Sequence, residues 1–158
     1  MRLPLRREPR VGVPPADGTV AWDAWTAGWG GALAIAFGNA ALHRAYAAAL
    51  PELTADQLAC VVLLVLILPW TVHVERRNPL DEPGDAVRVG LAWAGATVLF
   101  ESGSGHYVNG DGWSDLLAAY DVRAGRLWSL DVLGIAAAPS LARWWNRRAA
   151  GSALGTGW

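Results

Sequence analysis

The feature that most limits what this chain can fold into is the uncharged run Leu58–Trp70. It lies within Ala55–His73, a segment of about the length that an α-helix needs to cross a bilayer. A helix on the surface of a soluble bundle would carry a charged face, and this run carries none. The run therefore predicts a membrane span, with an apolar helix of a soluble bundle as the alternative.

Other segments extend this prediction to a polytopic membrane bundle, an all-α fold of four transmembrane helices. The additional spans are expected at Ala24–Ala49, Ala86–Glu101 and Leu127–Trp145. The first is rich in glycine and alanine, which let helices approach closely in lipid. Pro139 predicts a kink in the last. Thr54 and Gln57 have the spacing of a capping box at the start of the second helix.

Length and composition agree with one membrane domain. The chain has 158 residues, of which 53% are apolar and 17% charged. We expect a flexible cytoplasmic tail over residues 1–20, the bundle over 21–148 and a second flexible tail over 149–158. Ten tryptophans are present, and this residue favours the membrane interface. Interfacial belts are expected from Trp70, Trp144 and Trp145 at the inner face, and from Trp113 and Trp128 at the outer face.

Arginine placement predicts that both termini are cytoplasmic, because basic residues accumulate on that side. From the N-terminal tail through the successive connections to the C-terminal tail, the arginines number 4, 1, 3, 2 and 3. In order these are Arg2, Arg6, Arg7 and Arg10; Arg44; Arg76, Arg77 and Arg88; Arg123 and Arg126; and Arg143, Arg147 and Arg148. The alternation fits four spans and a cell-membrane location.

The connection between the third and fourth spans has features of its own. Ser102–Gly105 is expected to be flexible, and the following segment to Gly112 has strong turn chemistry. After it, an apolar stripe at helical spacing predicts a short amphipathic helix at the membrane surface. The stripe consists of Trp113, Leu116, Leu117 and Tyr120. A re-entrant segment is the alternative.

Once the topology is drawn, several polar residues fall at the outer end of the bundle. The candidate intramembrane cluster is Asn39, His43, Arg44, Glu101, His106, Asp115, Arg126 and Asp131. Ionisable groups within a membrane are costly and usually paired, so we expect Glu101 to contact Arg126 first and Arg44 second. A proton or cation site, or a general base, is the functional alternative for Glu101. Asn39, His43 and Tyr46 share one helical face, which should point into the protein.

Motifs for cofactors, metals or nucleic acid are not recognisable. The net charge of −1 gives no bulk attraction to nucleic acid. The single cysteine, Cys60, excludes a disulfide within the chain, and the spacing of His43 and His106 from the carboxylates matches no metal motif. No cofactor and no catalytic set is therefore predicted. The expected partners are membrane lipid and either further copies of the chain or another membrane protein.

The segment Gly90–Pro139 resembles a family of small, uncharacterised bacterial integral membrane proteins with four helices. The residues that carry the resemblance are Gly90, Phe100-Glu101, Gly105, Tyr107-Val108, Gly110, Trp113, Leu116-Leu117, Tyr120-Asp121, Gly125-Arg126, Trp128 and Pro139. It covers about a third of the chain well and the first two helices loosely. The chain departs from the pattern at Asp56, where the family often has histidine, and at Asp131, where an apolar residue is expected. The resemblance implies the fold and supplies no activity.

Three functions follow as hypotheses. One is a structural or accessory membrane protein whose polar cluster holds the bundle together, and this is the reading we favour. The second is an oligomeric transporter or ion-conducting protein with Glu101 in the pathway. The third is a membrane enzyme that uses Glu101, His106 and Asp115 on a lipid-soluble substrate.

Overall fold

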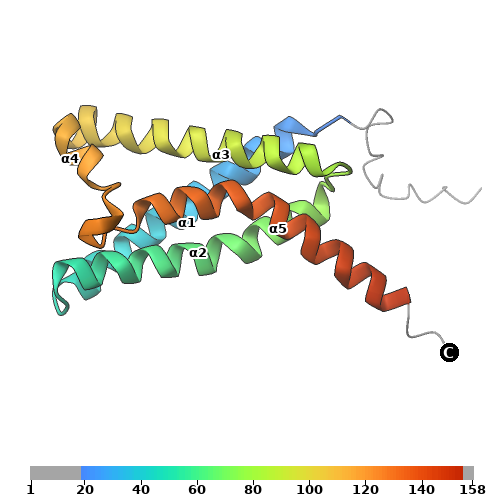
Figure 1. Ribbon diagram of the computed structural model, residues 1–158, viewed down its shortest axis with the longest axis horizontal. Coiled ribbons are helices and arrows are strands. Elements are labelled where there is room, and N and C mark those ends of the chain that lie inside the picture. The colour runs from blue at the N-terminus through green and yellow to red at the C-terminus, as the bar shows by residue number, and fades with distance from the viewer. Residues whose placement is uncertain (1–18, 155–158) are drawn as a thin grey trace, which may run out of the picture.

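The computed structural model describes residues 19–154, and these residues form helices joined by short connections (Figure 1). The long helices are α1 (Trp22–Ala47), α2 (Glu52–Arg77), α3 (Pro83–Ser104) and α5 (Trp128–Leu154). Between α3 and α5 lie the π-helical turn η1 (Gly105–Asn109), the short helix α4 (Trp113–Ala118) and the 3-10 turn η2 (Val122–Ala124). The all-α prediction is confirmed.

The start of α2 differs from the sequence prediction. This helix begins at Glu52 behind Pro51, and no side chain caps it. The expected capping box of Thr54 and Gln57 is therefore wrong. The Gln57 amide instead donates to the backbone oxygen of Gly125, 3.1 Å away. The side chain thus joins the start of α2 to the connection that leads into α5.

Two helices also end later than predicted. The helix α3 continues through Ser104, so the segment Ser102–Gly105, predicted to be flexible, is helical. The helix α5 continues to Leu154, beyond the expected bundle boundary at residue 148. The expected tail over residues 1–20 lies almost wholly outside the described residues, as do the last four residues of the chain. Pro139 lies inside α5, which changes direction near its middle (Figure 1).

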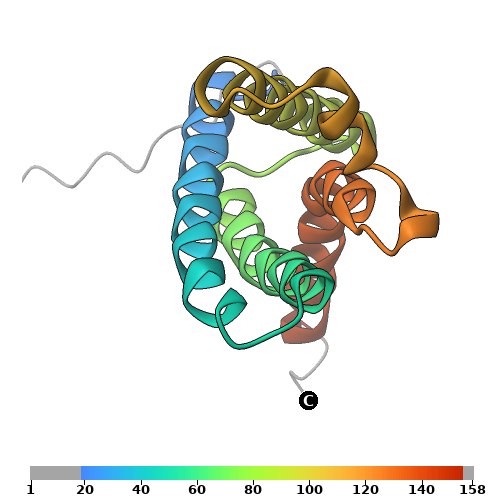
Figure 2. The ribbon, with the colours of Figure 1, turned by 90° about the vertical axis from the view of Figure 1, so that its left-hand side faces the viewer.

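Successive long helices run in opposite directions, and α2 and α5 occupy the centre of the packing. α1 packs on α2, α2 on α5, and α5 on α3. Seen along the bundle, α1 forms one side of the arrangement, and its start lies beside α3 (Figure 2). Large aromatic side chains fill the space between them. The rings of Trp25 and Trp93 are 5.6 Å apart, and Phe100 lies edge-on to both Trp29 and Phe37.

Indole N–H groups tie these helices to each other. Trp93 donates to the backbone oxygen of Trp25 at 3.0 Å, and Trp29 donates to the Thr97 hydroxyl at 3.1 Å. Trp70 donates to the backbone oxygen of Gly28 at 2.8 Å. A buried indole N–H needs such a partner. Trp70 therefore packs between α2 and α1, and its place in an interfacial belt stays a prediction.

Glycines allow the closest approaches between helices. A Cβ atom at Gly90 of α3 would lie 1.9 Å from the backbone oxygen of Ala136 in α5. At Gly31 of α1 it would lie 2.2 Å from the ring of Trp70. No other side chain fits at either position. The expectation that small residues bring α1 close to its neighbour is thus confirmed at Gly31 and Gly28, whereas Gly30 and Gly38 face open space within the described structure.

By length and apolar composition, α2 is the one helix among the described residues that qualifies as a membrane span. Only 22% of its most apolar stretch is buried inside the bundle. The other long helices fall short on composition, because α1 and α3 are rich in glycine, alanine and tryptophan and α5 contains Asp131 and Arg143. The number of spans therefore stays a prediction.

Candidate functional site: a polar junction at one end of the bundle

The helix directions bring the predicted polar residues to one end of the bundle. This end holds the last turns of α1 and α3 and the first turns of α2 and α5, together with α4 (Figure 1). We call it the junction end. The opposite end holds the connection between α2 and α3 and the last turns of α5. It carries more arginines, and we call it the arginine-rich end.

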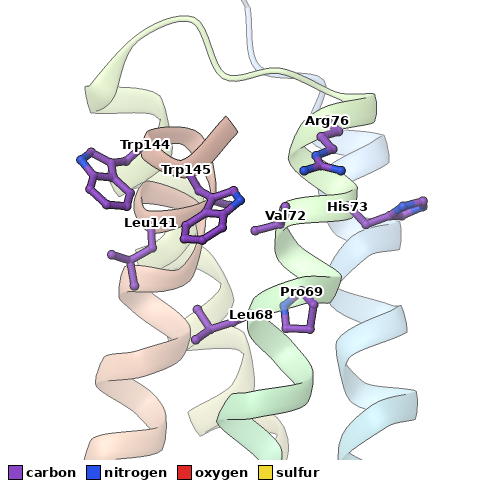
Figure 3. A pocket seen from close by; sticks show the side chains of 9 residues that line it. Leu68, Pro69, Val72, His73, Arg76, Leu141, Trp144 and Trp145 are labelled. Atoms are coloured by element: carbon purple, nitrogen blue, oxygen red, sulfur yellow. The ribbon is translucent and has the colours of Figure 1, made fainter. Parts of the chain in front are cut away.

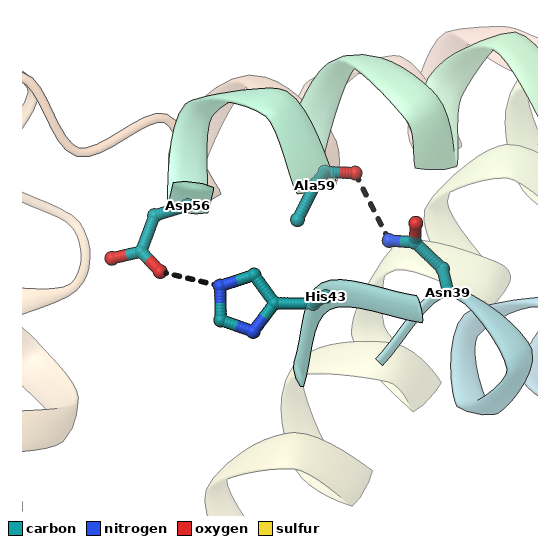
Figure 4. Close-up of polar contacts among 4 residues, drawn as sticks. All are labelled: Asn39, His43, Asp56 and Ala59. Carbon is teal, nitrogen blue, oxygen red and sulfur yellow. Dashed lines mark hydrogen bonds and ion pairs between the residues drawn. The ribbon is translucent and has the colours of Figure 1, made fainter. Parts of the chain in front are cut away.

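Two side chains of α1 bind to α2 at the junction end (Figure 4). The connection between these helices, residues 48–51, is short, so the last turns of α1 lie against the first turns of α2. The Asn39 amide donates to the backbone oxygen of Ala59 at 3.0 Å. The His43 Nε2 atom lies 3.1 Å from Asp56 Oδ1. Tyr46 lies on the same face, its ring edge-on to that of His43.

Asp131 extends this group of residues into α5. Its side chain is 1% exposed, and it interacts with the thiol of Cys60 on α2. Within the described part of the chain, Oδ1 of Asp131 has no hydrogen-bond partner. The same holds there for Asn39 Oδ1 and the Tyr46 hydroxyl, which are also buried. We call the set of Asn39, His43, Tyr46, Asp56, Cys60 and Asp131 the polar junction.

Three of the four buried side-chain atoms without a partner in the described structure gather at the polar junction; the fourth, Trp25 Nε1, lies elsewhere. A buried polar group without a hydrogen bond costs roughly 1–3 kcal/mol. The junction joins α1, α2 and α5, yet it leaves a carboxylate oxygen, an amide oxygen and a hydroxyl unsatisfied in the same part of the described structure. Such a site is suited to a water molecule or a transferable proton.

Glu101 does not belong to the polar junction. It is exposed at the end of α3, and the ion pairs among residues 19–152 are His43–Asp56 and Asp85–Arg88. The predicted contacts of Glu101 with Arg126 and with Arg44 are therefore wrong. Arg44 is exposed in the last turn of α1, where the short connection holds this helix against α2. Arg126 follows Gly125, which Gln57 and Leu53 hold against the start of α2.

The remaining candidates lie in the connection between α3 and α5. His106 Nδ1 lies 2.9 Å from the backbone oxygen of Asp111, and its ring stacks on Trp113. Asp115 is exposed on α4. A cavity of about 210 Å³ opens here between Glu101, Asn109 and Tyr120, and neither His106 nor Asp115 lines it. The set of Glu101, His106 and Asp115 predicted for an enzyme is therefore not assembled.

The short helix α4 confirms the expected helical turn after residue 112, but its apolar stripe is divided. Leu116 packs against Gly105 and lines the same cavity as Tyr120. Trp113 and Leu117 are exposed, at 54% and 70%. Leu116 and Tyr120 thus line the protein, Trp113 is exposed on one side while it stacks on His106, and Leu117 is exposed.

A second polar network, at the arginine-rich end, was missed in the sequence. Arg143 and Arg147 of α5 both donate to the backbone oxygens of Leu80 and Asp81. Asn146 bonds to the buried Glu75 and to Arg76. These residues fasten α5 to the end of α2 and to the connection that follows it. Arg147 therefore has a structural contact, whereas the sequence indicated a topology signal or, less favoured, a contact with anionic lipid head groups.

Comparison with protein-family models, curated proteins and solved structures finds no match to the chain. The resemblance to small four-helix bacterial membrane proteins therefore stays a prediction. Among the described residues, no three histidine, cysteine or acidic side chains are grouped so that they could hold a metal ion. The polar junction brings together ionisable residues from three helices, α1, α2 and α5.

Asp56 and Cys60 are the junction residues that sequence reasoning did not select. Asp56 stood out only as a departure from the family pattern, and Cys60 only as a lone cysteine. A usable signal was present, because His43 and Asp56 flank a short connection at comparable distances from it. Helices joined by a short connection are antiparallel neighbours, so these two side chains could have been paired in advance.

Proposed function

We propose that the chain is a multi-pass membrane protein of four spans with a structural or accessory role. The observation that carries the proposal is the apolar outer surface of all four described long helices. Exposed large apolar side chains occur along each of them, and include Phe37, Leu42, Val61, Val65, Val87, Leu91, Leu99, Leu133 and Leu141. A soluble monomer rarely exposes apolar surface on this scale.

Helix lengths agree with this proposal. The four long helices have 26, 26, 22 and 27 residues, and about 20 suffice to cross the hydrocarbon core. Charged residues are concentrated near the helix ends. In α3 the uncharged centre, residues 89–100, is short, but the exposed Arg88 side chain can extend toward the interface. Asp131 of α5 is buried inside the protein rather than exposed to lipid.

The arginines support an orientation with both termini in the cytoplasm. The arginine-rich end carries Arg76, Arg77, Arg88, Arg143, Arg147 and Arg148. The junction end carries Arg44, Arg123 and Arg126. The first end is where α1 begins and α5 ends, so we place it in the cytoplasm and the junction end outside. The proposal includes partners: further copies of the chain, or another membrane protein, cover part of the apolar surface.

Polar contacts inside the bundle favour the structural role. The bonds from Asn39, Trp29, Trp70 and Trp93 all join different helices. In lipid the hydrophobic effect does not hold helices together, and such bonds and close packing replace it. In the alternative arrangement, other copies of the chain cover the apolar surface and the whole assembly is soluble.

Membrane extraction separates these two arrangements. We expect the full chain, expressed in a bacterial host, to sediment with membranes and to stay there after washing at alkaline pH. Detergent should release it. Recovery of most of the chain in the alkaline supernatant would show that it is not integrated, and would overturn the proposal.

A second candidate function is supported by Asp131. A fully buried carboxylate in a membrane helix is costly and commonly serves proton or ion movement. The half-exposed pair His43–Asp56 lies at the same end and provides contact with the aqueous side. If the protein is a transporter of this kind, the pathway includes Asp131 rather than Glu101. Proteoliposomes loaded with a pH-sensitive dye test it, since Asp131→Asn should abolish proton flux that the unmodified protein shows.

A further inference from the structure

A groove runs between α2 and α5 on the outside of the bundle at the arginine-rich end (Figure 3). Its volume is about 570 Å³, within the range of about 300–1,000 Å³ that is usual for ligand sites. Leu68 and Val72 of α2 form one wall, and Leu141 and Trp145 of α5 form the other. Arg76 lies at the upper end of the groove in Figure 3.

The polarity of the groove changes along its length. Arg76 is in the last turn of α2, at the charged end of the helix, whereas Leu68 lies about 12 Å further toward the centre of the bundle at about 1.5 Å per residue. The exposed indoles of Trp144 and Trp145 lie on the α5 side. The groove thus offers a cation at the level of the interface and an apolar channel below it. This is the arrangement of a phospholipid, with its headgroup above an acyl chain.

Arg76 has donors available for an anion. Its Nε atom donates to Asn146 Oδ1 at 2.9 Å, and among the described residues its guanidinium forms no ion pair. Glu75 is next to Arg76 in the sequence, but its side chain is only 4% exposed. Its carboxylate accepts a hydrogen bond from the Asn146 side-chain nitrogen. No acidic side chain of the described structure lines the groove. Arg148, above the ring of Trp144 at 4.0 Å, adds positive charge nearby.

We propose that this groove binds an anionic phospholipid of the cytoplasmic leaflet, with its phosphate on Arg76 and one acyl chain along Leu68 and Leu141. Guanidinium binds phosphate through paired hydrogen bonds. Basic sites between transmembrane helices on the cytoplasmic side are suited to anionic headgroups. The inference rests on the proposed membrane location and orientation, and it adds a specific ligand class to them.

Native mass spectrometry of the purified full chain in detergent tests the lipid site. The probes are phosphatidylglycerol and phosphatidylcholine with identical acyl chains, added at equal concentration. We expect phosphatidylglycerol to bind preferentially, and Arg76→Gln to weaken its binding about fivefold. Arg76→Lys, which keeps the charge, should retain most of the preference. Trp145→Ala should weaken both lipids to a similar extent, because it removes apolar contact.

Arg77→Gln is the matched control, since Arg77 is exposed in the same helix turn and does not line the groove. Each variant is first checked for an unchanged melting temperature. Equal binding of the two lipids to the unmodified protein, equal losses in Arg76→Gln and Arg77→Gln, or a lipid-free dimer that Trp145→Ala dissociates would each overturn the lipid site. Recovery of the chain as a soluble protein would instead overturn the membrane proposal, before any lipid is added.

Discussion

Asp131 is buried among α5 and α2, and its Oδ1 atom has no hydrogen-bond partner in the described structure. Replacing this carboxylate by an uncharged amide of the same shape should therefore stabilise the folded protein. We predict that Asp131→Asn raises the free energy of unfolding in detergent by about 1 kcal/mol, because an unsatisfied buried carboxylate is costly. A chemical denaturation curve in detergent measures it.

Asp115→Asn is the control for this experiment, because Asp115 is exposed on α4 and its substitution should leave stability unchanged. A clear loss of stability in Asp131→Asn would mean that the carboxylate makes a favourable contact. A gain would mean that Asp131 is retained for something other than stability, which favours the proton pathway.

The pair His43–Asp56 should contribute little to stability. Its side chains are 30% and 40% exposed, and ion pairs at such positions couple by less than about 1 kcal/mol. We predict a coupling energy in that range from a double-mutant cycle of His43→Gln and Asp56→Asn, measured by unfolding in detergent. A coupling well above about 2 kcal/mol would show that the pair is a main support of the α1–α2 contact.

At the scale of residues, the sequence predicted where the polar groups gather and failed on which of them meet. Topology alone places Asn39, His43, Glu101 and Asp131 at one end. Partners depend on the rotation of each helix about its axis, which apolar runs define poorly. The shared face of Asn39, His43 and Tyr46 was predictable from helical spacing and points toward α2. The separation of Glu101 from Arg126 was not predictable, because it reflects a bond from Gln57 that fastens the connection before Arg126 to α2.

At the scale of elements, the contact between α3 and α5 depends on Gly90. Any side chain there would run into the backbone oxygen of Ala136, so the two helices would have to separate. We predict that Gly90→Ala costs about 2 kcal/mol of stability, as for other overpacked positions. The melting temperature in detergent measures it.

Gly95 provides the matched control in the same helix. No described atom outside its own helical turn lies within 4 Å of a Cβ atom built there. Gly95→Ala should therefore leave the melting temperature unchanged or raise it, since alanine favours a helix more than glycine does. If both substitutions are tolerated equally, α3 and α5 do not pack as closely as the structure has them.

The apolar runs predicted where the long helices lie, but they did not predict the residues at which these helices begin and end. The four segments expected to be helical are helical, but α2 starts before Thr54 and α3 continues through Gly103 to Ser104. Polar and small residues at the ends carry no hydrophobic signal. Contacts near the helix ends also join residues far apart in the chain, such as Arg143 and Leu80.

At the scale of the whole molecule, the outer surface of the bundle is apolar and requires surroundings that shield it from water. Small residues and indole bonds hold the helices together, and large aliphatic side chains are directed outward from each long helix. Aliphatic side chains such as Leu63, Ile67 and Ile135 also fill the centre, as in a soluble bundle, so the distinguishing feature is the additional apolar outer surface. The lipid environment that we propose would account for the exposed apolar surface and for the concentration of charge toward the helix ends.

Cysteine accessibility in intact cells tests the four-span account most directly. Cys60 is replaced by alanine, and single cysteines are introduced at Arg77 in the arginine-rich end and at Asn109 beyond α3. A membrane-impermeant thiol reagent should label the cysteine at position 109 in intact cells and the one at position 77 only after permeabilisation. Labelling of both positions in intact cells, or of neither until the cells are permeabilised, would contradict the account.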